Sequence, residues 1–200
     1  MSKVLILFAH PALEKSRVHN RLIRRVKNIQ DVHVHDLYEL YPDFDIDVKK
    51  EQKLLLEYNI IIWQHPFYWY SAPAIIKQWM DLVLEHNWAY GPEGNFLMGK
   101  KIFNAISTGG SSTAYSTKGR NRYSIRDLLA PFEQTARLCK MEYLPSFVIH
   151  DTHKLKKEEI ETFAEQYEQL LLSITTERLD NEAMQNVFHL NDLVSFPELI

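Results

Sequence analysis

Three features are missing from this sequence: a second cysteine, a basic stripe and a long apolar run. Cys139 stands alone, so it cannot form an intrachain disulfide, and no signal-peptide pattern precedes the first apolar segment. We therefore expect a cytoplasmic protein. With a formal net charge of -3 and scattered lysine and arginine, nucleic acid is not an expected partner. No apolar run approaches the roughly 20 residues that span a bilayer.

Several common site motifs are absent as well. No GxGxxG follows the first apolar segment and no GxSxG occurs, which argues against Rossmann-type dinucleotide binding and a serine hydrolase. Residues 94–100 spell GNFLMGK, but Lys101 replaces the Ser or Thr of a phosphate loop, and the segment precedes a predicted strand. His150-Asp151-Thr152-His153 has no second cluster at metal-ligand spacing, so we expect no metal site.

What the sequence contains is an alternation of short apolar segments and amphipathic ones. Strands are predicted at 3–9, 32–35, 59–64, 101–107 and 145–150, and helices at 17–29, 48–57, 73–83, 125–139 and 158–174. This alternation predicts an α/β fold with a doubly wound, five-stranded parallel sheet in the order 2-1-3-4-5. One domain over residues 1–175 accounts for it, and residues 176–200 form a tail that either frays or packs on the body or a partner subunit.

In such a sheet, ligands bind beyond the carboxyl ends of the strands where strand order reverses. The loop after the first predicted strand holds candidates for binding phosphate, because a helix start offers free amides and a favourable dipole. They are His10, Ser16, Arg17, His19 and Asn20. Taken alone, Ser16 is equally explained as a helix N-cap.

Two more loops follow at the same predicted edge. After the third strand, Phe67, Tyr68, Trp69 and Tyr70 stand in a row, and such aromatics suit either a flat ligand or the core. After the fourth strand, Ser107-Thr108-Gly109-Gly110 offers backbone amides that no side chain shields. The value of each loop lies in its coincidence with the other two.

These residues carry a resemblance to a known family. The chain resembles the flavodoxin-like NAD(P)H:quinone oxidoreductases, and most closely the ancillary proteins of glutathione-regulated potassium-efflux systems. The likeness covers about residues 3 to 172. It rests on AHP at 9–11, LYxLYPDFDID at 37–47, WQHPFYWYSAPAIIKQWMD at 63–81, WAYGPEGN at 88–95 and STGG at 107–110.

The resemblance implies a role for each loop. The first loop, through His10, Ser16, Arg17 and Asn20, would contact the phosphate and ribityl chain of FMN or FAD; Phe67 to Tyr70 would hold the isoalloxazine; Ser107 to Gly110 would face its pyrimidine edge. Tyr115 would assist charge redistribution as the flavin is reduced. One branch of the family has a histidine six positions after that tyrosine, whereas this chain has Asn121, so that histidine's role does not carry over, and Tyr123 or water is the suggested substitute.

The implied activity is ping-pong transfer of a hydride from NAD(P)H to the flavin and then to a quinone-like acceptor. The implied assembly is a homodimer, with the apolar face of 75–83 either at the dimer contact or buried in one subunit. The alternative function is a flavin-binding regulatory subunit that docks on a potassium-efflux transporter at the inner face of the membrane. A one-electron carrier is disfavoured, because the chain lacks a Thr/Ser-rich phosphate loop and a strongly acidic face.

Overall fold

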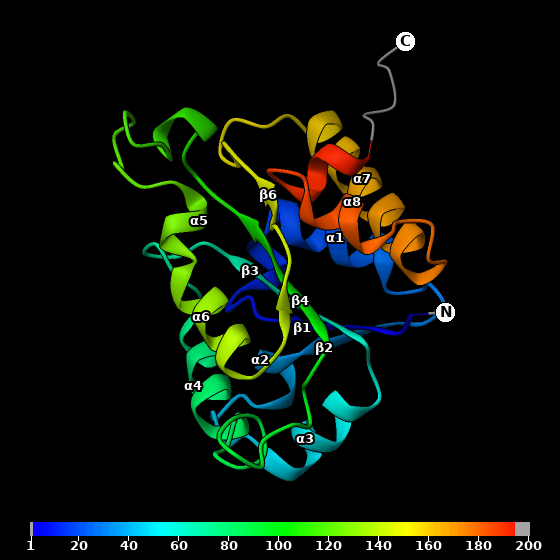
Figure 1. Cartoon of the computed structure of the whole chain (residues 1–200). Coiled ribbons are helices and arrows are strands. Elements are labelled where there is room, and N and C mark those ends of the chain that lie inside the picture. The colour runs from blue at the N-terminus through cyan, green and yellow to red at the C-terminus, as the bar shows by residue number, and fades with distance from the viewer. Residues whose placement is uncertain (1, 195–200) are drawn as a thin grey trace.

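The computed structural model describes residues 2–194, and within them six parallel strands form one sheet between two layers of helices (Figure 1). The strands are β1 (Val4–Phe8), β2 (Val32–Asp36), β3 (Ile60–Pro66), β4 (Lys101–Ser107), β5 (Glu142–Tyr143) and β6 (Phe147–Ile149). The order is β2-β1-β3-β4-β5, with β6 also paired to β4. This confirms the predicted doubly wound sheet.

The central strands are apolar because both faces of the sheet are covered. Every residue of β1 is fully buried, as a parallel strand between two helical layers requires. Its Val4 pairs with Val32 of β2 on one side and Ile60 of β3 on the other, which fixes the register of three strands at once. The continuous apolar run at 3–9 therefore correctly predicted a central position.

The fifth strand is where the observed sheet differs from the prediction. Instead of one strand at 145–150, two short segments pair with opposite ends of β4: β5 at Lys101 and Ile102, and β6 at Ala105 to Ser107. Pro145 lies between them, and because proline has no N–H it cannot donate to a ladder. The interruption explains why β6 is shorter than predicted.

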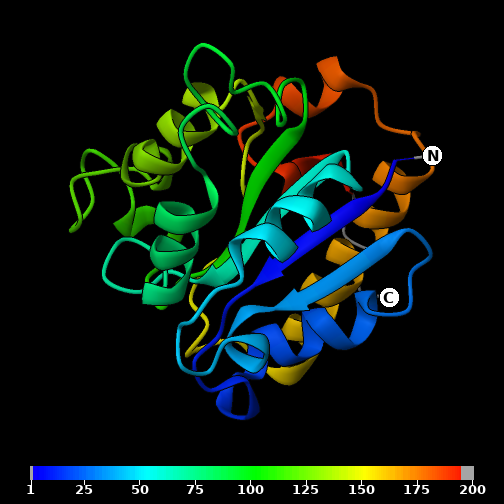
Figure 2. The ribbon, with the colours of Figure 1, turned by 90° about the horizontal axis from the view of Figure 1, so that it is seen from below.

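Helices cover both faces of the sheet (Figure 2), and each face has its own hydrophobic core. One face is covered by α2 (Leu37–Leu40), α3 (Val48–Leu56), α4 (Ala74–Val83), α5 (Ile125–Leu128) and α6 (Ala130–Leu138), and the other by α1 (Arg17–Val26) and α7 (Lys157–Thr175). The helix predicted at 125–139 is thus two helices, with Pro131 in the first turn of the second. No helix among residues 2–194 is long and apolar enough to cross a membrane.

Side chains of α4 are largely used within the chain itself. Ile75, Ile76, Trp79 and Val83 are all buried in the core beneath α4. The apolar face at 75–83 is therefore explained by packing inside one subunit. Cys139, at the end of α6, is buried in the same core.

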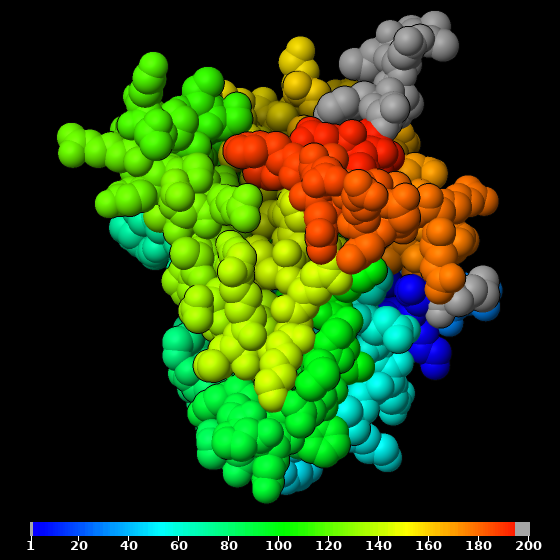
Figure 3. Space-filling view, in the orientation of Figure 1, coloured from blue at the N-terminus to red at the C-terminus, as the bar shows by residue number. Residues whose placement is uncertain are grey.

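The described part of the C-terminal tail packs on the body beside β6. It forms α8 (Asn181–Gln185) and a 3-10 turn (Leu190–Leu193), and its Met184 and Leu190 are buried. The Asn191 side chain accepts a hydrogen bond from the Val148 amide at 2.8 Å and donates to the Val148 carbonyl at 3.1 Å, as a neighbouring strand would. In Figure 3 this orange-to-red segment lies across the yellow chain that contains β6. The predicted tail residues 195–200 lie outside the described residues.

Candidate functional site

A cavity of about 500 Å³ lies at the carboxyl edge of the sheet, and all three predicted loops line it. The lining residues are His10, Lys15, Ser16, Arg17, Val18, Pro66, Phe67, Tyr68, Trp69, Ser107, Gly109, Thr152 and His153. They come from the ends of β1, β3, β4 and β6, which parallel pairing brings to one edge. The cavity therefore occupies the place where open α/β sheets bind ligands.

One end of the cavity is the start of α1. Ser16 is the N-cap, and its hydroxyl accepts a hydrogen bond from the His19 amide at 3.1 Å. The amides of Arg17 and Val18 precede the first helical hydrogen bond, so they are available to an anion. Lys15 and Arg17 add positive charge, and the Arg17 guanidinium also donates to the Leu155 carbonyl at 2.7 Å. This end suits a phosphate.

His10 adds a neutral donor from the end of β1. Burial lowers the pKa of His10, although nearby Glu14 opposes the effect, so the ring is uncharged at neutral pH. Its Nδ1 accepts a hydrogen bond from the Ala12 amide at 3.1 Å. The remaining proton of the neutral ring is therefore on Nε2, which makes His10 a hydrogen-bond donor at the cavity wall.

His19 lies beneath the cavity rather than in it. Burial holds its pKa well below the usual value, with His10 and His65 contributing in the same direction. The Gln64 amide nitrogen lies 3.4 Å from His19 Nδ1, and His19 Nε2 lies 2.9 Å from the Ser107 hydroxyl. An amide NH₂ can only donate, so Nδ1 accepts and Nε2–H donates to Ser107. The Ser107 hydroxyl hydrogen is then left for a partner in the cavity.

The aromatic loop stands over the other end of the cavity. Tyr68 and Ser71 form an isolated antiparallel bridge, and the two residues between them have positive φ, 49° for Trp69 and 63° for Tyr70. Positive φ at both central positions is the pattern of a type I′ turn. The turn leaves the Trp69 side chain 93% exposed, with Phe67 buried at its base. Such a projecting ring can stack on a flat ligand.

The glycine loop is tightly enclosed by rings from neighbouring loops. A Cβ at Gly109 would lie 2.8 Å from Nε2 of His153, and one at Gly110 would lie 3.0 Å from Cε2 of Tyr115. Larger residues at either position would displace those rings. Burial raises the pKa of Tyr115, although the side-chain hydrogen bond with Thr108 opposes this, so the phenol keeps its proton at neutral pH.

The structure places the predicted residues unequally around the cavity. Those that line it are His10, Ser16, Arg17, Phe67, Tyr68, Trp69, Ser107 and Gly109; those that do not are His19, Asn20, Tyr70, Thr108, Gly110 and Tyr115. Asn20 lines an adjacent hollow that shares Lys15, Ser16 and Arg17 with the cavity. The Tyr70 phenol is 3.5 Å from the Asn121 amide oxygen.

Sequence reasoning missed five lining residues: Lys15, Val18, Pro66, Thr152 and His153. Lys15 was not singled out, and Thr152 and His153 were set aside as part of a polar loop without metal-ligand spacing. The signal that could have found the last two was position, because they follow β6 at the same edge of the sheet as the other loops.

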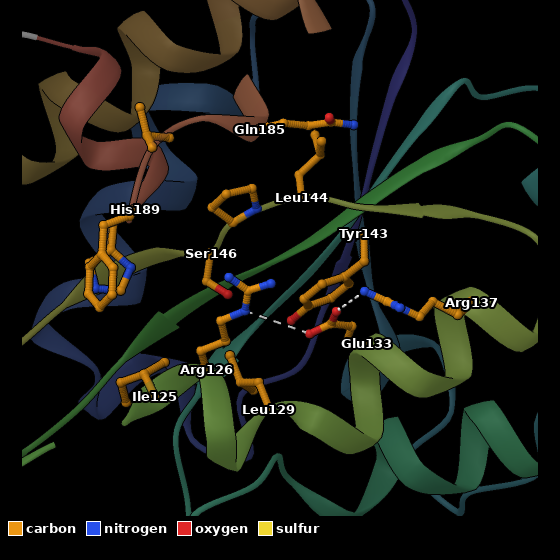
Figure 4. Close-up of a pocket in the computed structure, with 13 residues that line it drawn as sticks. Ile125, Arg126, Leu129, Glu133, Arg137, Tyr143, Leu144, Ser146, Gln185 and His189 are labelled. Carbon is orange, nitrogen blue, oxygen red and sulfur yellow. Dashed lines mark hydrogen bonds and ion pairs between the residues drawn. The ribbon is translucent and has the colours of Figure 1, made fainter. Parts of the chain in front are cut away.

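A second cavity, of about 340 Å³, opens between α5, α6, the β5–β6 connection and the tail (Figure 4). Arg126 and Arg137 both face Glu133 at one side of it, and His189 of the tail and Ser146 lie at another. The Tyr143 hydroxyl at its floor donates to Asn104 at 2.6 Å. Of the polar side chains that line this cavity, Arg137 donates to Glu133 at 2.6 Å, while His189 Nδ1 is buried without a hydrogen-bond partner among the described residues.

Comparison with known families gives the chain its place. Residues 2–171 match a family described as having a flavodoxin-like fold. The chain belongs to this flavodoxin-like family. Among curated relatives, a protein named uncharacterized NAD(P)H oxidoreductase YrkL from Bacillus subtilis is 45% identical over 163 residues, which is 82% of this chain and 94% of the relative. A protein of Serratia proteamaculans named glutathione-regulated potassium-efflux system ancillary protein KefG is 45% identical over 165 residues, which is 82% of this chain and 90% of the relative.

Solved structures agree with this assignment. General stress protein 14 of Treponema denticola, determined in complex with FMN, has a TM-score of 0.82 and 39% identity, covering 86% of this chain and 99% of its own. A protein from P. pentosaceus described as an NADPH-quinone reductase has a TM-score of 0.76 and 35% identity, covering 84% and 96%. The tail beyond residue 171 lies outside the family match.

Proposed function

We propose that this protein is an FMN-dependent NAD(P)H:quinone oxidoreductase. The observation that carries the proposal is the single cavity of about 500 Å³ in which a cationic helix start, neutral donors and a projecting aromatic turn meet. Relatives and structural neighbours named as an NAD(P)H oxidoreductase, an FMN complex and an NADPH-quinone reductase support the same chemistry. FMN fits better than an uncharged ligand because one end of the cavity is built for a phosphate.

The residues of the cavity divide the work of holding the flavin. Lys15, Arg17 and the free amides at the start of α1 would bind the phosphate, and Ser107 and His10 would donate to polar atoms between phosphate and ring. The aromatic turn would cover the flat ring system. Bound flavin supplies acceptance of a hydride from nicotinamide and its delivery to an acceptor, while the protein supplies orientation.

The glycine loop and Tyr115 would manage charge at the far edge of the ring. Gly109 lines the cavity, and without a side chain there the backbone amides can approach a ligand closely. Tyr115, protonated at neutral pH, stands beside Gly110 and can donate its phenolic hydrogen as negative charge develops. A ping-pong cycle follows if nicotinamide and quinone bind in turn at the same place beside the ring.

The test starts from the purified protein. We expect a yellow protein whose released ligand has the mass of FMN, and whose NADH or NADPH oxidation requires a benzoquinone and gives parallel reciprocal plots. Arg17→Ala should weaken FMN binding by about tenfold to a hundredfold, as expected for lost hydrogen bonds to a charged group, whereas Arg137→Ala, on α6, should not change it. A colourless protein that neither FMN nor FAD reconstitutes would contradict the proposal.

A second candidate function is that of a regulatory subunit of a potassium-efflux transporter. It is favoured by the relative named as a potassium-efflux ancillary protein, because the match spans 90% of that relative's length. In that case the flavin site serves as a sensing or structural ligand site. A transporter that co-purifies with this protein from detergent extracts would support it. Extracts from a strain that lacks the transporter serve as the control. Quinone turnover in the absence of any partner would support the enzyme.

A further inference from the structure

His150 directly follows β6 and reaches the glycine loop from below. Its Nδ1 lies 3.1 Å from the Thr108 hydroxyl oxygen, and that hydroxyl donates to the Gly110 carbonyl at 2.8 Å. Thr108 is buried, so its hydroxyl has few other partners to choose from. His150 thus connects the end of β6 to the turn after β4.

The direction of the bond follows from counting hydrogens. The Thr108 hydroxyl has one hydrogen, and the Gly110 carbonyl takes it, so the lone pairs of the hydroxyl must accept from His150. Burial lowers the pKa of His150, with His189 contributing in the same direction, while the Gly110 carbonyl and Asp151 oppose the effect. The ring is therefore neutral at pH 7, and its one hydrogen is on Nδ1.

Tyr115 closes the cluster on the cavity side. Its ring centroid is 5.8 Å from that of His150, and its ring also lies beside Gly110. Phe67 contacts the Tyr115 ring edge-on, with centroids 6.0 Å apart. The phenol is therefore held between the aromatic loop and the pair formed by Thr108 and His150.

The tail holds His150 from the opposite side. The ring of His189 is 6.3 Å from that of His150 and forms part of the second cavity, where Figure 4 shows it beside Ser146. His189 lies in the segment beyond the family match, which ends at residue 171. His150 thus contacts a part of this chain that lies beyond the family match.

We propose that His150 is a positioning residue for the glycine loop, holding Gly110 and Tyr115 through the Thr108 hydroxyl so that the loop can receive the flavin. The proposal rests on the function proposed above and assigns a role to a residue outside the cavity lining. His150 donates one hydrogen bond, Thr108 passes it on to Gly110, and the Tyr115 ring lies against both. Loss of the His150 donor would let the Thr108 hydroxyl rotate away from the Gly110 carbonyl, which would then be held by the Asp151 amide alone.

Two substitutions at one position separate the hydrogen bond from the ring. His150→Asn keeps an N–H donor where Nδ1 stands, while His150→Phe keeps an aromatic ring against Tyr115 and His189 but donates nothing. FMN affinity of each apoprotein is measured from flavin fluorescence. We expect a Kd within about threefold of wild type for His150→Asn and about tenfold weaker for His150→Phe, as for one lost buried hydrogen bond.

His33 supplies a matched control. It is also a histidine whose ring contacts a tyrosine, Tyr58, with centroids 6.0 Å apart, but it lies on β2 away from the cavity. His33→Phe should leave the Kd for FMN unchanged. Unfolding midpoints of the two His150 variants, measured without FMN, should agree within a few degrees, which separates positioning from a loss of overall stability.

Coupling to Thr108 tests the route through the hydroxyl. Because Thr108→Val and His150→Phe remove the same hydrogen bond, the double variant should bind FMN no more weakly than the weaker single variant. Thr108→Val combined with His33→Phe should show the effect of Thr108→Val alone. Fully additive losses for Thr108 and His150 would overturn the proposal, as would equal affinities of His150→Phe and wild type.

Failure of this proposal and failure of the flavin function give different results. If wild type binds FMN and the His150 variants do so equally, only the role of His150 is wrong. If wild type binds no flavin, the proposed function is wrong, and the apoprotein still tests the geometry through NMR. In that experiment the Gly110 and Tyr115 amide shifts should change in His150→Phe and stay near wild type in His150→Asn; unchanged shifts in both overturn the placement.

Discussion

Trp69 and Tyr70 hold a left-handed backbone conformation although neither is glycine, asparagine or aspartate. For ordinary side chains this conformation costs roughly 1 to 2 kcal/mol per residue. The Trp69 ring regains little of that cost by burial, because it is 93% exposed. Two adjacent strained residues beside a cavity are typical of sites where side-chain placement matters more than stability.

Relieving that strain should separate stability from binding. Replacing Trp69-Tyr70 with Asn-Gly, the preferred type I′ pair, should raise the free energy of unfolding by about 1 kcal/mol in a urea titration while weakening FMN binding. Asp31→Gly relieves a similar φ of 64° far from the cavity, and it should stabilise the protein without affecting FMN. Retained FMN affinity in the Asn-Gly variant would show that the aromatic turn does not cover the flavin.

Glu51 is a buried carboxylate on which three donors converge. Its Oε1 accepts from the Tyr41 hydroxyl at 2.6 Å and lies 2.8 Å from His35 Nε2, and its Oε2 accepts from the Trp79 indole at 2.8 Å. Glu51→Gln would place an amide donor against one of these donors. We expect a loss of about 3 kcal/mol in urea unfolding, and a much smaller loss for Glu85→Gln at an exposed pair with Lys49.

The same residue predicts a pH dependence of stability. Burial raises the pKa of Glu51, but hydrogen bonds from His35, Tyr41 and Trp79 outweigh it, so the folded pKa lies below its ordinary value of 4.5. A depressed carboxyl pKa contributes stability above the unfolded pKa, and this is lost as pH falls through the folded one. The stability difference between wild type and Glu51→Gln should therefore narrow below pH 4.5; a constant difference down to pH 3 would contradict this assignment.

Among the elements, the sequence predicted those whose apolar pattern is decided by burial. β1 was placed centrally because its run of apolar residues is unbroken, and α1 was found from its helical spacing, although it ends at Val26 instead of residue 29. β5 was missed and β6 was predicted as the longer segment 145–150, because the effect of Pro145 depends on which amide the neighbouring strand needs. An apolar pattern shows which residues are buried, but it does not show which strands pair.

The site residues that the sequence predicted also differ from those it missed in how local their pattern is. Three loops were found because each carries a distinctive composition at a strand end, whereas His150, Thr152 and His153 sit in a polar loop with no recognisable spacing. The hydrogen bond from His150 to Thr108 joins residues 42 positions apart, so no local pattern could reveal it. Contacts of this kind become visible only when the strand order is combined with side-chain geometry.

The tail is the element whose attachment can be tested most directly. Asn191→Ala would leave the Val148 amide and carbonyl without the partners they have now, at a cost of about 1 to 3 kcal/mol. Urea unfolding and hydrogen exchange of the Val148 amide measure the two consequences. Asn181→Ala, at the exposed start of α8, serves as the control. Equal exchange rates of the Val148 amide in both variants would mean that Asn191 does not protect it.

In the molecule as a whole, the cavity for the proposed ligand and the buried Glu51 cluster lie in different regions. The cavity for the proposed cofactor lies at the carboxyl edge of the sheet, while Glu51 and its donors join α3, α4 and the chain after β2 in the core of one face. Substitutions that weaken one end should therefore leave the other largely intact, since distant sites contribute nearly additively. A Glu51→Gln protein that is still folded should bind FMN as wild type does.

The labelling rate of the single thiol measures how often the end of α6 opens. Cys139 is 1% exposed and burial raises its pKa to about 11, so an aromatic disulfide reagent can reach a reactive thiolate only while the end of α6 is detached. Its labelling rate should fall when FMN is added and rise in Glu51→Gln. Mixed-disulfide formation with glutathione should be slow for the same reason.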